Sequence, residues 1–550
     1  MLEETSRETA KTEKIAAQPK GLSKVLVWVA CLGLGLVIII RLVSFLQISL
    51  NWLSYPYWRP GSEGLILDET LRIRHGLPIY DPISQTAFIS GPYPPVFYYL
   101  NAWLMNFGGE GMQTGRWLAF GAALVCAGLV SWLVWQDNRS RWAAWLFGPL
   151  LLLTSPFLIW ASRNRGDVLM VAFNLAGLVC LSYLSLPETA PQATRSGQAS
   201  RIFLQNLLTI VSIVFFGLAF YTKQTGVAAP LAACVWLLSQ NWRFGLKYCA
   251  GLAAGLALPF AALEIVTHYE FYRHIVSYHA LPWTWVSFSH WTGVFVTDNP
   301  VLVITGVGLV LVTFGSWFYS RRINRRTTLL PTLTTPIIEN GSIRRISLLA
   351  WFNVFALLGL VTTGVEGADH NHLLLPMAAV VAGAGVACGW CLRLPGIVWR
   401  AAGITISIVL AAQLWFGWDG LLQKYDFDLT SKFSPTEQAQ MGKIIAYIKT
   451  VNGPILSEEV ALPALAGKEA QVEYNDVYTM GLLAEAGKWN PGGLTAQVRQ
   501  KHFALILVPF DLDSQRAANH KIWPPAVLQA IEDNYQIKFR DLWFMYVPKP

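Results

Sequence analysis

Long apolar runs dominate this chain of 550 residues and limit what it can fold into. Several of them approach the roughly 20 residues that a helix needs to cross a bilayer. Hydrophobic residues make up 54% of the chain and charged residues only 13%, whereas a soluble protein would carry about 25% charged residues. We therefore predict a polytopic α-helical membrane protein with about eleven spans. The predicted spans cover residues 25–46, 114–135, 143–160, 168–186, 203–220, 227–240, 248–266, 299–319, 346–364, 372–391 and 400–418.

The basic residues predict the orientation of these spans. With the N-terminus inside, the cytoplasmic loops contain Lys11, Lys14, Lys20, Lys24, Arg139, Arg141, Arg195, Arg201, Arg243, Lys247, Arg321, Arg322, Arg325, Arg326, Arg344, Arg345, Arg393 and Arg400. This pattern obeys the positive-inside rule, so the net charge of +8 does not call for a nucleic-acid partner. The stretch 95–107 is too short to cross comfortably, and we interpret it as a juxtamembrane or re-entrant helix. If it crossed, every later orientation would invert.

In this orientation the polar groups that could do chemistry share the outer face. They lie in the 47–113 loop, at 163–167, at Lys223, in the 267–298 loop, at 367–372 and in the C-terminal region. We predict a cytoplasmic tail at 1–24, a transmembrane catalytic domain at 25–418 and an extracytoplasmic α/β domain at 419–550. The predicted location is the plasma (inner) membrane. The apolar run at 25–46 is interpreted as a retained anchor, because no small-residue cleavage site precedes it.

The C-terminal region has the pattern of a small α/β domain. Ser434-Pro-Thr-Glu437 is a capping box with proline at the first helical position, and it predicts a helix to about Thr450. Further predicted elements are strands at 454–457 and 503–508, helices near 477–487 and 524–534, and a closing hairpin at 536–539 and 542–547. We interpret Glu458-Glu459 and Asn475-Asp476 as solvated loop residues.

The cysteines point to packing rather than to chemistry. All seven lie in or beside predicted spans, and none lies in the C-terminal region, which therefore has no disulfide framework. Cys388 and Cys391 have the spacing of a Cys-x-x-Cys motif. Because no second pair accompanies them, we interpret them as packing residues.

The first candidate functional residue is Glu63, in the turn Gly61–Gly64 before a helical segment. A carboxylate at this position could act as a general base toward a hydroxyl or an amine. A solvated loop acid is the simpler alternative, and Asp68 and Asp81 compete for any catalytic role.

Two further candidates are charged groups at span ends. In Arg163-Asn-Arg165-Gly-Asp167, apolar sequence on both sides means that the ions need partners. Either Asp167 pairs with one of the arginines as an anchor, or the arginines bind a phosphate while Asp167 orients a second substrate or a metal. Lys223 is either a snorkelling lysine or a point charge on a lipid phosphate.

The segment 367–372 contributes Asp369, His370 and His372. Their spacing is a weak metal signal, so we predict no metal site here and interpret them as donors to a phosphate or a sugar hydroxyl. The 267–298 loop is rich in tryptophan, tyrosine and histidine and could cover a sugar or a polyprenyl chain, although interfacial aromatic residues are common without such a role.

Taken in order, these segments resemble the GT-C fold glycosyltransferases, especially bacterial members related to protein O-mannosyltransferases and the lipid A aminoarabinose transferase. The resemblance covers roughly residues 25–400. It rests on Ser62-Glu63-Gly64, Gly76, Pro78-Ile-Tyr80-Asp81, Tyr93-Pro-Pro95, Arg163–Asp167, Tyr221–Gln224 and Ala368–His372. The family usually has Asp-Glu where this chain has Ser62-Glu63, so the role of base falls to Glu63 or to Asp68.

The resemblance implies an inverting transfer of a sugar from a polyprenyl-phosphate donor to a glycan, lipid or protein acceptor, among membrane lipids. Glu63 would deprotonate the acceptor, with Asp68 as its competitor, and Asp167 would orient the acceptor. The implied substrate-binding residues are Arg163, Arg165, Lys223, His370, His372 and Tyr80. The resemblance leaves open whether the reaction uses a divalent cation as a cofactor.

Two other classes of protein compete with this interpretation. One is a transporter or flippase of lipid-linked sugars, and the other is an oligosaccharide ligase or polymerase with a pyrophosphate-linked donor. The sequence shows no clear repeat and its polar groups cluster at one interface, which is unlike a transporter. The sequence excludes neither class, but the order of the motifs favours the transferase.

Overall fold

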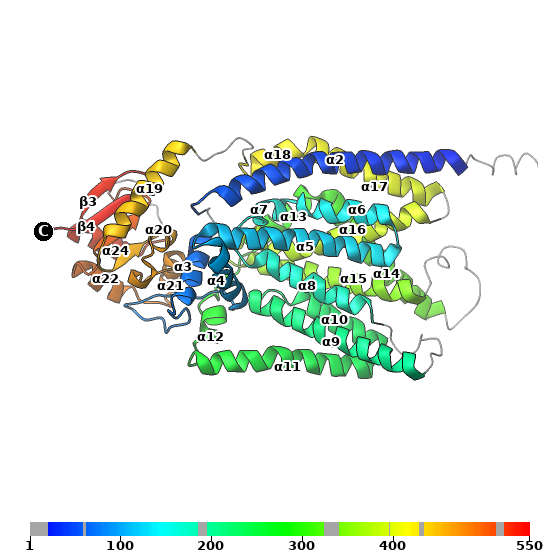
Figure 1. Cartoon of the computed structure of the whole chain (residues 1–550), viewed down its shortest axis with the longest axis horizontal. Coiled ribbons are helices and arrows are strands. Elements are labelled where there is room, and N and C mark those ends of the chain that lie inside the picture. Colours follow the sequence, from blue (N-terminus) through cyan, green and yellow to red (C-terminus); the bar gives the residue numbers. More distant parts are fainter. Residues whose placement is uncertain are drawn as a thin grey trace, which may run out of the picture.

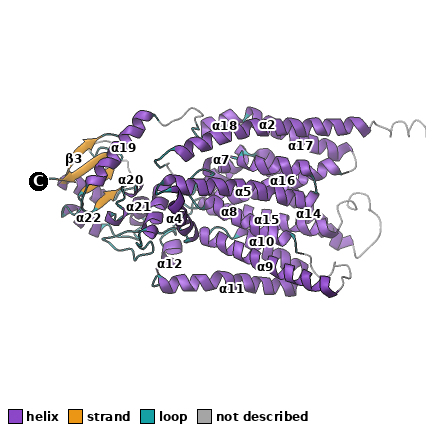
Figure 2. Cartoon of the chain, in the orientation of Figure 1, coloured by secondary structure: helices purple, strands orange, loops and turns teal. Residues whose placement is uncertain are grey.

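The computed structural model describes residues 20–58, 62–184, 195–323, 340–394, 397–427, 434–512 and 522–550. It is an elongated bundle of helices with a smaller domain at one end (Figure 1). The strands are confined to that smaller domain (Figure 2). Several residues used in the orientation and turn predictions lie outside the described residues: Lys11, Lys14, Gly61, Arg325 and Arg326.

The bundle is built from helices that alternate in direction along its long axis (Figure 1). Their bounds are α2 (Lys20–Ser54), α5 (Met112–Asn138), α6 (Arg141–Leu152), α7 (Ser155–Trp160), α8 (Asp167–Ser182), α9 (Arg195–Thr222), α10 (Ala228–Gln240), α11 (Trp242–Val266), α14 (Pro300–Ile323), α15 (Asn340–Leu358), α16 (Leu374–Arg393) and α17 (Ile397–Phe416). Shorter elements close the loops: α12 (Glu270–Tyr272), η2 (Arg273–Ser277), α13 (Trp285–Asp298), η3 (Gly359–Gly364), η4 (His370–Leu373) and α18 (Trp418–Lys424).

The predicted class of polytopic helical membrane protein is confirmed, whereas the count of eleven spans stays a prediction. Six helices among the described residues are long and apolar enough to cross a membrane: Lys24–Ser54, Met112–Asn138, Ile202–Thr222, Trp242–Val266, His370–Arg393 and Ile397–Phe416. Three shorter apolar helices and the pair α13–α14, which is bent by 97°, account for other predicted spans. The predicted span 143–160 is divided into α6 and α7, and Pro156 lies in the first turn of α7.

Two helices of the 47–113 loop lie beside the C-terminal domain at one end of the bundle (Figure 1). α3 (Glu63–Arg74) is buried over most of its length. α4 (Val96–Gly108) has 13 residues and is too short to span the membrane. It buries one face and exposes Tyr99, Trp103 and Phe107 on the other, a spacing of four residues that suits a helix at a membrane surface.

The C-terminal domain contains a four-stranded sheet in the order β1-β2-β4-β3. β1 (Ile455–Ser457) pairs parallel to β2 (Leu505–Val508), while β4 (Phe544–Pro548) pairs antiparallel to β2 and to β3 (Tyr535–Arg540). The helices around it are α19 (Pro435–Thr450), α20 (Ala461–Leu465), α21 (Val477–Glu485), α22 (Gly492–Arg499) and α24 (Pro525–Asn534). A further short turn is η5 (Glu469–Gln471). These elements agree with the sequence patterns because caps, alternation and turn residues are local signals.

The C-terminal domain packs directly against the outer loop of the membrane domain. Phe88 belongs to the core of the C-terminal domain and forms a bridge with Tyr474. Gly64 lies so close to this domain that a Cβ atom would collide with Glu459. Asn475 is buried and Glu459 lies close to α3, so the prediction that they are solvated is wrong. Burial raises the pKa of Glu459 to about 7.

Candidate active site

Asp167, the first residue of α8, holds two cations at the end of the bundle that faces the C-terminal domain. Its Oδ1 accepts hydrogen bonds from Lys223 Nζ and, at 3.0 Å, from Asn371 Nδ2; its Oδ2 accepts one from Arg165 Nε at 3.2 Å. Asp167, Lys223 and Arg165 are all buried. One carboxylate between two cations leaves a formal charge of +1 in a site shielded from water. We call these three residues the Asp167 cluster.

This arrangement shows which partners these charged residues have in the folded chain. Asp167 is ion-paired with Arg165. Arg163 Nε donates to the Ile159 carbonyl at 3.3 Å. Lys223 is only 4% exposed and is ion-paired with Asp167. It therefore does not snorkel to the membrane surface.

Aromatic rings hold the cations of the Asp167 cluster. The Arg165 guanidinium lies 4.9 Å from the ring centre of Tyr93 and 5.1 Å from that of Trp160, and its Nη2 donates to the Tyr93 hydroxyl at 2.5 Å. Lys223 Nζ lies 5.4 Å from the centre of the same tyrosine ring. Tyr93 belongs to the Tyr-Pro-Pro segment of the outer loop, so this loop is bound to the cationic cluster by cation–π contacts.

A small cavity adjoins the Asp167 cluster. It has a volume of about 10 Å³ and is lined by Ile66, Tyr93, Phe97, Tyr98, Gly166, Asp167, Thr222 and Lys223. That volume holds about one water molecule. A larger ligand must therefore displace side chains when it enters.

Glu63, the predicted base, is held in a closed ion pair. Arg116 of α5 binds it in a bidentate manner, Nε to Oε1 at 3.0 Å and Nη2 to Oε2 at 2.6 Å, and the Asn164 N–H donates to Oε1 at 2.6 Å. Arg116 also donates to the backbone carbonyls of Trp52, Tyr55 and Tyr57. Both residues are completely buried. These contacts join α3, α5 and the turn before α8, and the role of base stays a prediction for Glu63.

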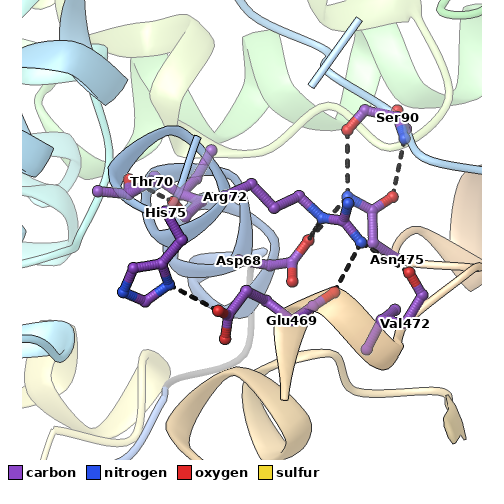
Figure 3. A network of polar contacts seen from close by, with 9 residues as sticks. Asp68, Thr70, Arg72, His75, Ser90, Glu469, Val472 and Asn475 are labelled. Carbon is purple, nitrogen blue, oxygen red and sulfur yellow. Dashed lines mark hydrogen bonds and ion pairs between the residues drawn. The ribbon is translucent and has the colours of Figure 1, made fainter. Parts of the chain in front are cut away.

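Asp68, the competing acid, connects α3 to the C-terminal domain (Figure 3). Its Oδ2 accepts from Arg72 Nε at 2.9 Å and from Asn475 Nδ2 at 3.1 Å. Arg72 Nη2 continues to the carbonyls of Glu469 and Val472. Burial raises the pKa of Asp68, and Arg72 opposes that shift. This network docks the C-terminal domain against α3, and the catalytic role stays a prediction for Asp68.

Glu69 is a buried acid of α3 that our sequence reasoning missed. It is completely buried, and neither carboxyl oxygen makes a hydrogen bond of ordinary geometry. The Tyr98 side chain interacts with it, and Asp68, Asp476 and Arg165 are near enough to act electrostatically. Burial raises the pKa of Glu69 well above its usual value. Nothing in the sequence distinguishes Glu69 from Asp68 beside it. In the structure Glu69 lies three residues after Ile66, which lines the cavity.

The late loop brings Asn371, rather than its histidines, into direct contact with Asp167. His370 Nδ1 binds the Asp369 carboxylate at 2.7 Å, and its ring lies between Trp291 and Tyr425. His372 Nδ1 binds the Thr362 hydroxyl at 2.8 Å. The two histidines thus bind different partners.

The remaining predicted residues lie at the edge of the site. Arg163 stacks over Trp160 at 4.7 Å and interacts electrostatically with Asp369. Tyr80 is buried, and its hydroxyl donates to the Tyr93 carbonyl at 2.7 Å, so it stabilises the outer loop around Tyr93. Among the described residues, no group of three or more His, Cys, Asp or Glu side chains is arranged to hold a metal ion.

Comparison with known proteins places the chain by its fold. No family model and no curated protein sequence matches it. ArnT from Cupriavidus metallidurans is similar in structure in its apo state, with a TM-score of 0.56 and 13% identity over 93% of this chain and 97% of ArnT. The same enzyme bound to undecaprenyl phosphate gives 0.56 and 13% over 96% and 98%.

A second similar structure is the apo oligosaccharyltransferase of Archaeoglobus fulgidus. Its TM-score is 0.51 at 12% identity, over 94% of this chain and 73% of the archaeal one. At this level of identity the likeness concerns the fold. The GT-C fold predicted from the sequence is confirmed.

Proposed function

We propose that this protein is an inverting glycosyltransferase that transfers a sugar from a polyprenyl-phosphate donor to an acceptor at the outer face of the plasma membrane. The observation that carries the proposal is the Asp167 cluster, a buried site with an excess of one positive charge. It lies in a fold shared with a protein whose structure was solved with undecaprenyl phosphate.

The charges of the cluster suit the leaving group of this reaction. When the bond between the sugar C1 and the phosphate oxygen breaks, negative charge develops on the phosphate. Lys223 and Arg165 are held in place by Asp167 before the substrate arrives, so little reorganisation is needed at that moment. Arg163, at the edge of the site, adds a further cation.

The test is sugar transfer by the purified full-length protein. Labelled polyprenyl-phosphate sugars would be supplied with a cell-envelope extract, and products would be identified by mass spectrometry. In parallel, the envelope lipids and glycans of a deletion strain should lack one sugar modification. An unchanged envelope, together with no transfer from any such donor, would refute the proposal. Repeating the assay after EDTA treatment, with and without added Mg²⁺ or Mn²⁺, decides whether a divalent cation takes part.

The fold of the archaeal oligosaccharyltransferase favours a second candidate, the transfer of a preassembled glycan. The mass of the transferred group separates the two candidates. A single sugar supports the first, and an oligosaccharide supports the second.

The proposed orientation places the Asp167 cluster and the C-terminal domain outside the cytoplasm. The described basic residues Arg139, Arg243 and Arg393 lie at the helix ends opposite the C-terminal domain, as the positive-inside rule requires for this orientation (Figure 1). A reporter that is active only outside the cytoplasm, fused after Pro550, should be active. Activity of a cytoplasmic reporter at the same position would refute the orientation.

A further inference from the structure

Among the acids of α3, Glu69 differs in its surroundings. Glu63 is paired with Arg116, and Asp68 is bound by Arg72 and Asn475. Glu69 is as deeply buried as both, yet neither of its oxygens has a hydrogen-bond partner of ordinary geometry. Burying a carboxyl group without a partner is costly, so proteins tend to keep such groups where they serve a function.

Glu69 lies beside the small cavity that adjoins the Asp167 cluster. Its neighbour Tyr98 lines that cavity together with Lys223 and Asp167. Ile66, one helical turn before Glu69, lines it as well. Ile66 and Tyr98 thus form the wall of the cavity next to Glu69, which does not itself line it, while Asp167 and Lys223 line the opposite wall.

We propose that Glu69 takes the proton from the acceptor during sugar transfer, and that Tyr98 is a positioning residue that orients the Glu69 carboxyl group. The inference rests on the glycosyl transfer proposed above. It moves the role of base away from the motif acid Glu63, whose two oxygens are occupied by Arg116 and by the Asn164 amide.

The step balances as follows. The acceptor O–H or N–H bond breaks, and its proton passes to the Glu69 carboxylate. The acceptor oxygen or nitrogen forms a bond to the sugar C1 while the bond from C1 to the phosphate oxygen breaks, and that electron pair stays on the phosphate. Lys223 and Arg165 stabilise the phosphate formed, and Glu69 returns its proton to water when the products leave.

The electrostatics of the site make Glu69 a stronger base than an ordinary carboxylate. Burial raises the pKa of Glu69 well above its usual value; Tyr98 and Arg165 oppose this shift, and Asp68 and Asp476 add to it. A carboxylate whose pKa is raised holds a proton more strongly than an ordinary one and is therefore a stronger base. The titratable and charged groups around it are Asp68 on α3, Tyr98 on α4, Tyr80 in the outer loop, Arg165 before α8 and Asp476 before α21.

The test is the pH dependence of transfer by the full-length enzyme with a saturating polyprenyl-phosphate sugar. In the wild type, kcat should rise with pH as Glu69 ionises. Glu69→Gln should lower kcat by about 10²–10⁴-fold and remove this rise, while sugar-donor affinity and thermal stability are retained. Glu69→Asp should keep the rise at a lower rate, and Tyr98→Phe should shift it along the pH axis. Glu532→Gln, an exposed acid on α24, is the matched control.

The outcomes separate this inference from the proposed function. If the wild type transfers sugar and Glu69→Gln keeps the rise with pH, Glu69 is not the base, whether or not the overall rate falls. If Glu69→Gln does not fold, the pH profile of Glu69→Asp decides: a profile identical to that of the wild type at full rate overturns the inference. If the wild type transfers no sugar from any polyprenyl phosphate at any pH, the proposed function fails and the role of Glu69 fails with it.

Discussion

The Glu63–Arg116 pair and the Asp167 cluster are both buried ion pairs at the same end of the bundle, but they differ in charge balance. Glu63 meets one guanidinium, and that guanidinium also donates to three backbone carbonyls. Asp167 meets two cations, which rest on aromatic rings beside a cavity. The first pair is neutral and saturated, whereas the second retains a positive charge.

This difference separates a structural site from a binding site. A buried pair whose hydrogen bonds are all used cannot gain from a ligand, and removing either partner leaves a charge in a low-dielectric environment. A buried cluster with excess charge is stabilised further by a counter-ion, and a phosphate carries the right sign. Burial alone would not distinguish them, because Glu63 and Asp167 are equally inaccessible to water.

The largest effect is expected from breaking the neutral pair. Glu63→Gln keeps the shape of the side chain but leaves Arg116 charged and uncompensated, so the free energy of unfolding should fall by about 3–5 kcal/mol. Thermal unfolding of the detergent-purified protein measures this loss. Glu110→Gln, which breaks the more exposed pair with Arg74, is the control and should cost less than about 1 kcal/mol. Wild-type stability combined with lost transfer in Glu63→Gln would restore Glu63 as the base.

A smaller effect, on binding rather than on folding, is expected at the Asp167 cluster. Lys223→Gln removes one of the two cations, while Arg165 and Asn371 still hold Asp167. A charge-assisted hydrogen bond contributes about 1.5–3 kcal/mol, so the affinity for the sugar donor should fall on the order of tenfold or more. Titration of the donor at saturating acceptor measures it, with the exposed Lys443→Gln as the control. An unchanged affinity would mean that the phosphate is held elsewhere, with Arg163 and Arg165 as the next candidates.

The sequence predicted the grouping of the site at one end because that grouping follows from helix order. Charges at span ends and alternating directions place 163–167, Lys223 and 367–372 together without any knowledge of side-chain packing. The helix at 435–450 and the strands of the C-terminal domain were predictable for another reason, because helix caps and alternating hydrophobic residues are local signals. The bend at Asn299 and the break between α6 and α7 depend on packing and were not predicted.

The pairing within the site could not be predicted, because partners are chosen by tertiary packing. Arg116 lies at the start of a predicted span, where an ionisable residue should have been treated as a functional or structural signal. Its partner Glu63 belongs to another helix, and nothing local connects the two. Glu69 was passed over because Asp68 beside it matched the expected acid equally well. The two acids are equally buried, and only their hydrogen-bond partners in the folded chain distinguish them.

The smallest effect on stability is expected at His274, a buried neutral side chain whose two ring nitrogens are both hydrogen-bonded. Like Glu63 it is fully paired, but its pairing depends on pH. His274 accepts from the Gly91 N–H through Nδ1 and donates to the Asp81 carbonyl through Nε2, so it joins two parts of the outer loops only in its neutral form.

Burial lowers the pKa of His274 from 6.5 to about 4. As pH falls, the unfolded chain binds a proton near pH 6.5, whereas the folded chain binds one only near pH 4. The contribution of His274 to stability is therefore complete above pH 6.5 and is lost as pH falls toward 4. Between about pH 7 and pH 5.5 the loss should be about 1 kcal/mol. His274→Gln, whose amide can accept and donate at the same two positions, should reduce this part of the pH dependence of Tm, whereas the exposed His502→Gln should not. An identical pH dependence in His274→Gln and the wild type would show that His274 is not bound in the folded state as described.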